Sequence, residues 1–270
     1  MIDTHCHLTF PDFRSDPDGE LARAAEAGVA GCITVSTTSS DCVDALSMAE
    51  SHSNVWCTSG VHPLYADRGP HDWETVVRCA RSPRCAAWGE LGLDQHYDQP
   101  SQAAQLAVLA EQLARIEAAT TESGEPGLAK PVVIHCREAF SDLLPILRAS
   151  AIPGDRFVFH CFTGAPDDAS AVLDFGAMLS FTGVVTYRNA KDVQAAARTV
   201  PIDRIMCETD APYLAPEPKR GERPCRPWMT ALTARFLAEL RSEPWEVFHS
   251  AINANTSRFF GIEVPAEPGA

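Results

Sequence analysis

Short apolar runs alternate with longer amphipathic runs along the whole chain, and this alternation constrains the fold more than any other feature. Eight of the apolar runs have the length of strands, at residues 1–7, 31–36, 55–61, 86–91, 131–136, 156–161, 177–182 and 205–208. Helical patterns follow the first seven of them, at residues 18–27, 40–51, 73–81, 102–122, 140–149, 166–175 and 192–200. Two more helices, at 228–240 and 245–260, follow the eighth.

Repeated strand-then-helix units predict parallel strands joined by right-handed crossovers. We therefore predict an α/β fold, a single (β/α)₈ barrel of the TIM type with extra C-terminal helices; a doubly wound open sheet is the alternative. No repeat, low-complexity tract or linker divides the chain, so we expect one hydrolase domain at residues 1–264 and a short tail at 265–270. Ser40 and Ser101 are expected to cap helices.

Composition and charge exclude several classes of protein. No apolar segment approaches the roughly 18 residues of a membrane span, and the first residues, MIDTHCHL, lack the features of a secretory signal. We therefore expect a cytoplasmic protein without a membrane partner, and favour a monomer. A net charge of −14 argues against tight, non-specific binding of duplex DNA. It does not argue against an enzyme that holds one phosphate through metal ions.

The ten cysteines do not form the pattern of a disulfide scaffold. No CxxC pair is present, and most of the cysteines fall inside the apolar runs, where they resemble small buried hydrophobes in a reducing compartment. We expect them to be buried and reduced, with Cys225 as the exception, because its loop is expected to face solvent. The cysteines in the apolar runs are Cys6, Cys32, Cys57, Cys85, Cys136, Cys161 and Cys207.

The first apolar run ends in the sequence Asp3-Thr4-His5-Cys6-His7. Alternate side chains of a strand share a face, so His5 and His7 can converge on one ion while Cys6 points away. A bare HxH is common by chance, and the simpler interpretation is a polar strand end.

Repetition of this placement favours a metal site. Four more ionisable residues stand at or near the C-terminal ends of other apolar runs: Glu90, His135, His160 and Asp210. In a barrel these ends meet where the chemistry occurs. Burying all six groups without a cation would leave uncompensated charge or unpaired imidazole.

The six candidates divide between two ions. His5, His7 and Asp210 can hold one, and His135 with His160 a second, while the carboxylate of Glu90 bridges both. Imidazole and carboxylate ligands suit Zn²⁺, Mn²⁺ or Fe²⁺ better than Mg²⁺, although Mg²⁺ is not excluded. Two further residues are candidates for the substrate site. His62 could contact substrate or act as an acid, and Arg137 could meet an anion or form a salt bridge at the rim.

Eight segments along almost the whole chain resemble the TatD family of metal-dependent deoxyribonucleases. They are D-T-H-C-H (3–7), G-V-H-P (60–63), G-E-L-G-L-D (89–94), P-V-V-I-H-C-R (131–137), H-C-F-T-G (160–164), S-F-T-G-V-V-T (180–186), P-I-D-R-I-M-C-E-T-D-A-P-Y-L (201–214) and N-A-N-T-S-R-F-F-G (253–261).

The resemblance implies a TIM-type barrel, two metal ions and hydrolysis of DNA phosphodiesters, commonly as an exonuclease. It implies a first ion on His5, His7, Glu90 and Asp210, and a second on Glu90, His135 and His160. The chain departs from the family at Leu64, where another histidine is usual, and at Pro224–Pro227, after Arg220-Gly221. Both departures lie in loops expected to touch substrate.

The expected substrate is therefore DNA or a small phosphodiester. In the expected mechanism an activated water attacks phosphorus, Asp210 accepts its proton, and Arg137 or the ions stabilise the developing charge. Arg137 and Arg220 are the expected DNA contacts. Two alternatives remain: hydrolysis of an amide or ester at the same site, and a non-catalytic protein with a structural metal.

Overall fold

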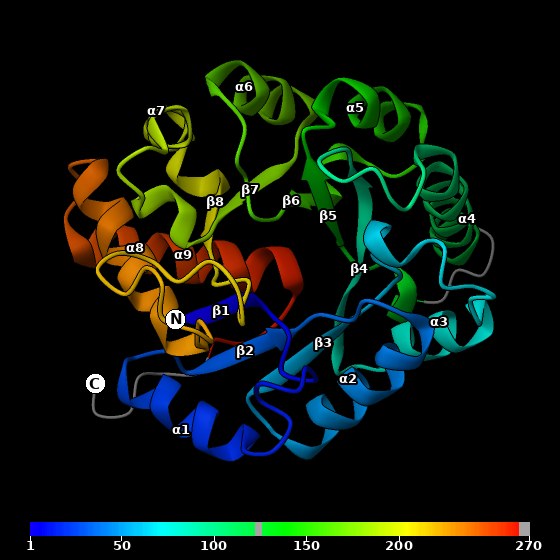
Figure 1. The fold of residues 1–270 in the computed structure, drawn as a ribbon, viewed down its shortest axis with the longest axis horizontal. Helices are drawn as coiled ribbons and strands as arrows, with labels where there is room; N and C mark the ends of the chain where they lie inside the picture. The colour runs from blue at the N-terminus through cyan, green and yellow to red at the C-terminus, as the bar shows by residue number, and fades with distance from the viewer. Residues whose placement is uncertain (122–125, 265–270) are drawn as a thin grey trace.

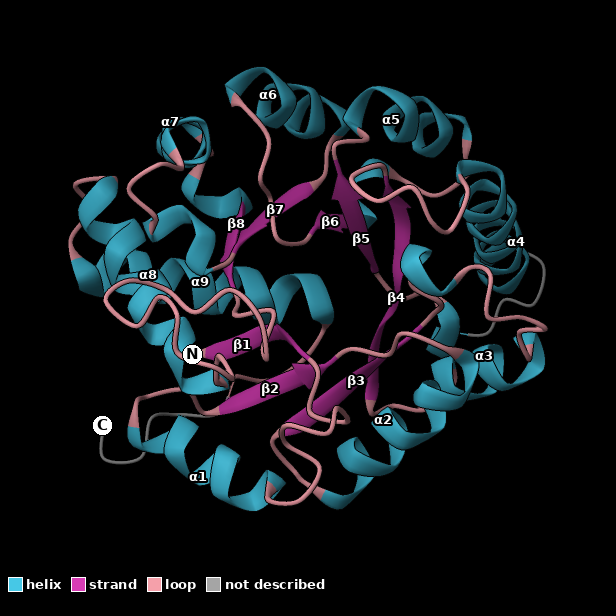
Figure 2. Ribbon diagram, in the orientation of Figure 1, coloured by secondary structure: helices cyan, strands magenta, loops and turns pink. Residues whose placement is uncertain are grey.

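Each strand pairs in parallel with its neighbour in the sequence, so the sheet order is β1 to β8 without a crossover. This order is that of a (β/α)₈ barrel and excludes the doubly wound alternative (Figure 2). The computed structural model describes residues 1–121 and 126–264, and the expected tail at 265–270 lies outside them. The strands are β1 (Ile2–Cys6), β2 (Gly31–Thr34), β3 (Val55–Ser59), β4 (Cys85–Asp94), β5 (Val132–Arg137), β6 (Phe157–Phe159), β7 (Met178–Phe181) and β8 (Ile205–Cys207).

The helices surround the strands, and the chain passes once around the ring (Figure 1). They are α1 (Pro17–Glu26), α2 (Ser39–Ser51), α3 (Trp73–Ala80), α4 (Gln102–Thr121), α5 (Phe140–Ala149), α6 (Pro166–Phe175), α7 (Lys191–Thr199), α8 (Thr230–Leu240) and α9 (Trp245–Phe260). The extra helix α9 packs against β8 and β1, where the ring closes. No helix within the described ranges is long and apolar enough to cross a bilayer.

The barrel closes between β1 and the segment that follows β8. The amide of His7 donates to the carbonyl of Ala211 at 2.8 Å, and the amide of Asp210 donates to the carbonyl of His5 at 2.8 Å. Below them, the buried carboxyl group of Asp3 accepts a hydrogen bond from the amide of Thr209 at 2.9 Å. The bonds that close the barrel therefore also fix the backbone of three predicted metal ligands.

Apolar side chains fill the barrel near the beginnings of its strands. All eight strands contribute to this inner cluster, and the segment at the end of α9 adds Phe260 and Ile262. A larger cluster lies between the strands and the surrounding helices. The interior is therefore packed at one end, which leaves the other end for polar chemistry. The strand residues of the inner cluster are Ile2, Ile33, Trp56, Ala86, Ala87, Val133, Val158, Met178 and Met206.

One of the two expected helix caps is confirmed. The Ser101 hydroxyl accepts a hydrogen bond from the amide of Ala104 in the first turn of α4. The prediction for Ser40 is wrong, because α2 begins earlier and Thr38 accepts from the amide of Asp41 instead. Both Thr38 and Ser40 carry a hydroxyl suitable for capping, so the sequence alone did not distinguish them.

All ten cysteines are free, and nine are buried. The expectation of an exposed Cys225 is wrong: its side chain is packed in the outer core, and its amide donates to the carbonyl of Pro212 at 3.0 Å. Cys161, which follows β6, is the one cysteine that retains partial exposure. Burial raises the pKa of most of these thiols, for example that of Cys42 to about 12, and so makes them poor nucleophiles. Cys85, whose pKa is lowered by its hydrogen bond with Cys57, is nevertheless buried.

We expect at most one of the ten thiols to react quickly with an aromatic disulfide reagent in the native protein, and all ten to react in denaturant. The reason is burial, since access and thiolate formation are both suppressed. Spectrophotometric titration of the released thiolate gives the count. Cys161→Ser should abolish any fast native reaction; rapid modification of several thiols in the native Cys161→Ser protein would contradict the packing described.

Candidate metal centre at the mouth of the barrel

The six predicted ligands come together at the carboxyl ends of the strands. Five of them line a cavity of about 770 Å³, and His5 is the one that does not. His5 and His7 come from the end of β1, and the other four from β4, β5 and the residues after β6 and β8: Glu90, His135, His160 and Asp210.

Local backbone features bring these side chains inward. The pairing of β1 with β2 is irregular between Asp3 and Cys6. Along this segment Cys6 packs in the outer core, while His5 and His7 face the centre of the barrel. This confirms the predicted alternation. In β4, Gly92 has a φ of +149°, and a Cβ there would lie 1.9 Å from the carbonyl oxygen of His135. A glycine is therefore required where β4 meets β5.

Glu90 lies at the centre of the cluster, as expected for a bridging ligand. Its Oε1 is 2.7 Å from Nδ1 of His135 and 2.6 Å from Nε2 of His160, and its Oε2 is 3.1 Å from Nε2 of His5. Burial opposes ionisation of Glu90, but the imidazoles of His160, His62 and His5 hold its pKa well below the usual range. Oε1 of Glu90 thus faces His135 and His160, whereas Oε2 faces His5.

The first group contains His5, His7 and Asp210, whose ligand atoms lie within 4.8 Å of one another. Nε2 of His7 is 3.4 Å from Oδ1 of Asp210, and Nε2 of His5 is 3.7 Å from the same oxygen. Burial opposes the charge on Asp210, but its hydrogen bond with His7 and the charges of His5 and His160 lower its pKa. Asp210 is therefore a carboxylate at neutral pH.

Each ligand imidazole except that of His5 has an outer partner on its second nitrogen. Nδ1 of His7 lies 3.0 Å from the carbonyl oxygen of Val35. Nε2 of His135 lies 3.0 Å from Oδ2 of Asp94, and Nδ1 of His160 lies 3.3 Å from Oε1 of Glu208. Such partners fix the ring and leave the other nitrogen free toward the centre.

Asp94 and Glu208 were absent from the predicted site. The same alternation that paired His5 with His7 places Asp94 on the face of Glu90. Alternation does not relate Glu208 to Asp210, because both follow the end of β8 and Asp210 has a φ of +59°. The prediction ended the fourth strand at residue 91, whereas β4 continues to Asp94.

The donor set fits metal ions. Nδ1 of His5 is buried without a partner, and Nε2 of His5 and Oε2 of Glu90, which lie 3.1 Å apart, are buried without a hydrogen bond of good geometry. Buried polar atoms are normally satisfied, and a cation would satisfy these three atoms. Imidazole and carboxylate together are typical ligands of Zn²⁺ and other transition metals.

His62 forms a further group with Glu90 and His135, whose ligand atoms lie within 4.8 Å of one another, but its hydrogen bonds differ from those of His135. Its Nδ1 accepts from the amide of Leu64 at 3.0 Å, so the neutral ring carries its proton on Nε2. That nitrogen is 3.2 Å from Oε1 of Glu90. Burial is the main cause that lowers the pKa of His62, which is therefore a neutral N–H donor at pH 7. A donor of this kind can serve a substrate oxygen better than a metal ion.

The rim contains only one of the two predicted arginine contacts. Arg137 lines the cavity, but Arg220 does not; its guanidinium lies 4.1 Å from the ring centroid of Tyr187. Arg223, three residues further along this loop, lines the cavity instead. Leu64, the first departure from the family pattern, also lines it, whereas no residue of the second departure, Pro224–Pro227, does.

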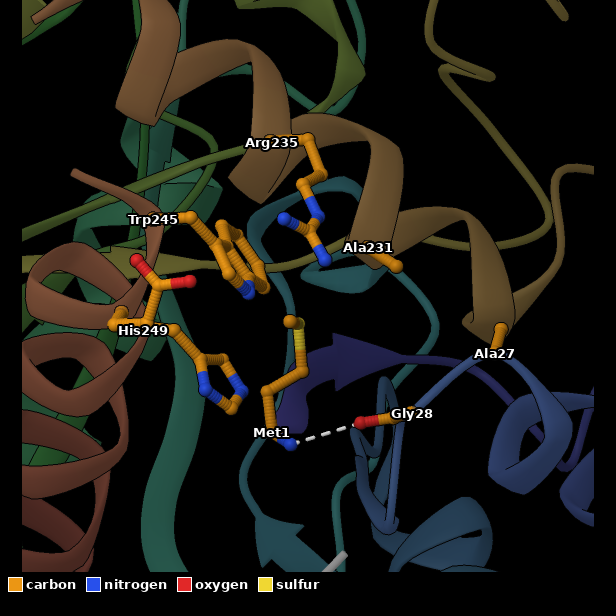
Figure 3. A pocket seen from close by; sticks show the side chains of 8 residues that line it. Met1, Ala27, Gly28, Ala231, Arg235, Trp245 and His249 are labelled. Carbon is orange, nitrogen blue, oxygen red and sulfur yellow. Dashed lines mark hydrogen bonds between the residues drawn. The ribbon is translucent and has the colours of Figure 1, made fainter. Parts of the chain in front are cut away.

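A second cavity, of about 440 Å³, lies near the beginnings of β1 and β2 and is separate from this site. Its walls include Met1, Gly28 and a stack in which Trp245 lies between Arg235 and His249 (Figure 3). None of the six predicted ligands contributes to it.

Comparisons with known proteins identify the family of this chain. Residues 2–261 match the family model described as TatD related DNase. The chain is 36% identical over 266 residues to an uncharacterized metal-dependent hydrolase of Escherichia coli K12, YcfH, in a match covering 97% of this chain and 96% of the relative. It is 33% identical over 269 residues to the 3'-5' ssDNA/RNA exonuclease TatD of Enterobacter lignolyticus, with 97% and 99% covered.

Among solved structures, the TatD homolog YJJV of Escherichia coli K12 superimposes with a TM-score of 0.86 at 29% identity, covering 97% of this chain and 98% of that one. Sequence, fold and family model thus agree over nearly the whole chain. The chain belongs to the family of TatD related DNases, and it is a hydrolytic enzyme.

Proposed function

We propose that this protein is a two-metal exonuclease that hydrolyses phosphodiester bonds at the ends of DNA strands or in single-stranded DNA. The observation that carries the proposal is Glu90, whose Oε2 faces His5 of the first ligand set while its Oε1 faces His135 and His160 of the second. The name of the Enterobacter relative, an exonuclease of single-stranded DNA and RNA, supports the substrate class. Residues 1–264 would form one catalytic domain, and the unpaired thiols favour a reducing compartment such as the cytoplasm.

We assign the first ion to His5, His7, Glu90 and Asp210, and the second to Glu90, His135 and His160. The number of imidazoles favours zinc or manganese over magnesium. When bound, such ions supply Lewis acidity and favour deprotonation of a water molecule.

The side chains of this chain would perform the remaining steps. Asp210, a carboxylate at neutral pH, accepts a proton from the attacking water. The Nε2–H of His62 donates to a phosphate oxygen as negative charge develops. Arg137, at the rim, orients the phosphate. The direct test is to incubate the purified protein with single-stranded DNA, RNA and an amide panel, with and without added metals. Cleavage of amides alone would favour the carbonyl-hydrolase alternative.

Metal binding is expected to raise the thermal midpoint. A free metal concentration about 100 times Kd stabilises a one-site protein by about 2.7 kcal/mol, which corresponds to roughly 5–10 °C in a domain of this size. Differential scanning fluorimetry with manganese or zinc, against chelator, measures the shift. Glu90→Gln serves as the control and should show little shift. A wild-type midpoint that does not respond to any divalent ion would contradict the assignment.

The increase of the thermal midpoint on metal binding should become smaller as pH falls. Although burial opposes protonation, Asp210 raises the pKa of His7, and Asp94 and Glu90 raise that of His135. In the metal-free protein these raised values stabilise the fold below the ordinary histidine pKa, and the contribution is lost as pH rises through the raised values. Metal binding requires the deprotonated rings, so its stabilisation grows over that same range.

Arg137→Ala should lower kcat/KM for DNA about ten- to a hundredfold while changing hydrolysis of a neutral ester little, because only the phosphate carries a charge for the guanidinium. Because the protein is acidic, only a few side chains can contact DNA phosphates. The slope of log Kd against log salt should therefore correspond to roughly one to three phosphate contacts. Arg220→Ala, outside the cavity, is the matched control. Unchanged DNA cleavage by Arg137→Ala would remove this residue from the substrate site.

A further inference from the structure

Two tyrosine rings stand exposed at the rim of the cavity. Tyr97 is 51% exposed and Tyr213 is 47% exposed, and both line the cavity. Among the described residues, the large hydrophobic side chains classed as exposed are these two tyrosines, Val43 and Val247. Exposed aromatic surface concentrated at one mouth indicates a binding surface.

The two tyrosines follow strands on opposite sides of the barrel. Tyr97 follows β4 and Tyr213 follows β8, and these strands face one another across the ring (Figure 2). The same two positions supply Glu90 and Asp210 to the floor between them. A phosphodiester at the floor would therefore have one aromatic ring on each side.

Neighbouring side chains hold both rings. The guanidinium of Arg137 lies 5.1 Å from the ring centroid of Tyr97, and the edge of His96 is packed at 4.9 Å. The amide of Tyr213 donates to the carbonyl of Asp210 at 2.9 Å, and its ring meets Phe10 edge-on at 6.5 Å. Tyr97 is thus in contact with Arg137, and Tyr213 is hydrogen-bonded through its backbone to Asp210, and both of these partners line the cavity.

The charge of the protein explains why such rings are needed. With a net charge of −14, the chain cannot hold a polyanion through a broad basic surface. Base–aromatic stacking is uncharged and tolerates any base, and it contributes strongly for each stacked base. In a duplex the base faces are covered by the neighbouring pairs, so only an unpaired base can use a protein ring.

We propose that Tyr97 and Tyr213 stack on the two nucleobases that flank the phosphate at the floor, and that this stacking makes the site select unpaired strands. The inference rests on the proposed nuclease function and adds two specificity-determining residues to it.

The test compares two oligonucleotides with the wild-type protein and four variants. One oligonucleotide is a fluorescent ten-residue thymidine strand, and the other carries abasic tetrahydrofuran units at both nucleosides flanking the terminal phosphodiester. Fluorescence anisotropy in chelator gives Kd without hydrolysis, and gel assays with metal give KM and kcat. The variants are Tyr97→Leu, Tyr213→Leu, Tyr97→Phe and Tyr213→Phe.

Each leucine variant should weaken binding of the normal strand about tenfold or more and leave binding of the abasic strand unchanged. Each phenylalanine variant keeps the ring and should stay within about twofold of wild type. In the cleavage assay the loss should appear in KM, with kcat nearly unchanged. Thermal unfolding, expected to change little because both side chains are half exposed, verifies the fold.

Equal effects of the leucine substitutions on both strands, or no effect on either, would overturn the stacking inference. If the wild type cleaves DNA in that case, the proposed function stands. Ring-dependent binding without any cleavage would support stacking and refute the nuclease function. Neither binding nor cleavage by the wild type would refute both.

Discussion

Replacing Glu90 with glutamine is expected to empty both metal positions and to lower the rate of DNA hydrolysis by about a thousandfold or more. The carboxylate is 1% exposed, and its oxygens lie within 3.2 Å of four imidazoles. Glutamine keeps the size of the side chain but removes the charge and one acceptor oxygen. The amide cannot bridge two cations as a carboxylate does.

Metal content by mass spectrometry and kcat/KM on single-stranded DNA measure the two effects. The wild type should hold about two ions per chain, and Glu90→Gln close to none. Glu111→Gln, an exposed change on α4 next to Arg115, is the matched control and should behave as wild type. His5→Ala should mainly weaken the first ion. Two fully occupied ions in Glu90→Gln would remove this residue from the centre of the site.

The fold could be predicted from the sequence because hydrophobic periodicity is a local property that barrel packing preserves. The eight predicted strands and nine predicted helices all have counterparts within a few residues among the described elements. Parallel strands bring their carboxyl ends to one side, so His135 and His160 could be grouped although they come from different strands.

Hydrophobic periodicity alone did not predict the carboxylates that contact the outer nitrogens of the ligand imidazoles, nor the residues at the rim of the cavity. Asp94 was missed because the strand was ended three residues early, although its spacing from Glu90 placed it on the same face. The carboxylate of Glu208 accepts hydrogen bonds from the amide of Cys161 and the hydroxyl of Ser180. These contacts link residues far apart in the sequence, which no local pattern reveals.

Loops account for the remaining errors. Arg220 was expected to contact DNA, but Arg223 lines the cavity instead, because neighbouring side chains of a loop without a repeat point in unrelated directions. Cys225 lies in the same loop and was expected to face solvent; it is buried in the outer core. A loop that packs over a barrel end buries some of its residues, and only the structure shows which ones.

Replacing Asp210 with asparagine is expected to lower kcat about a hundred- to ten-thousandfold, the range of a general base. The carboxylate of Asp210 is 16% exposed, whereas that of Glu90 is buried. Its hydrogen bond with His7 and the nearby imidazoles keep it ionised against the effect of burial, so it can accept a proton at neutral pH. Asparagine fills the same space but cannot take a proton.

The pH profile separates this role from metal binding. The pKa of Asp210 is lowered, so in the wild type, with metal kept saturating because metal binding weakens as pH falls, its contribution to kcat should persist from neutral pH down to acidic pH. In Asp210→Asn the remaining rate should rise with pH, because hydroxide from solvent replaces the missing base. The ion that we assign to Glu90, His135 and His160 should stay, so metal content should fall by at most one ion per chain. Full recovery of kcat at high metal concentration would show that Asp210 acts only as a ligand and that another group accepts the proton.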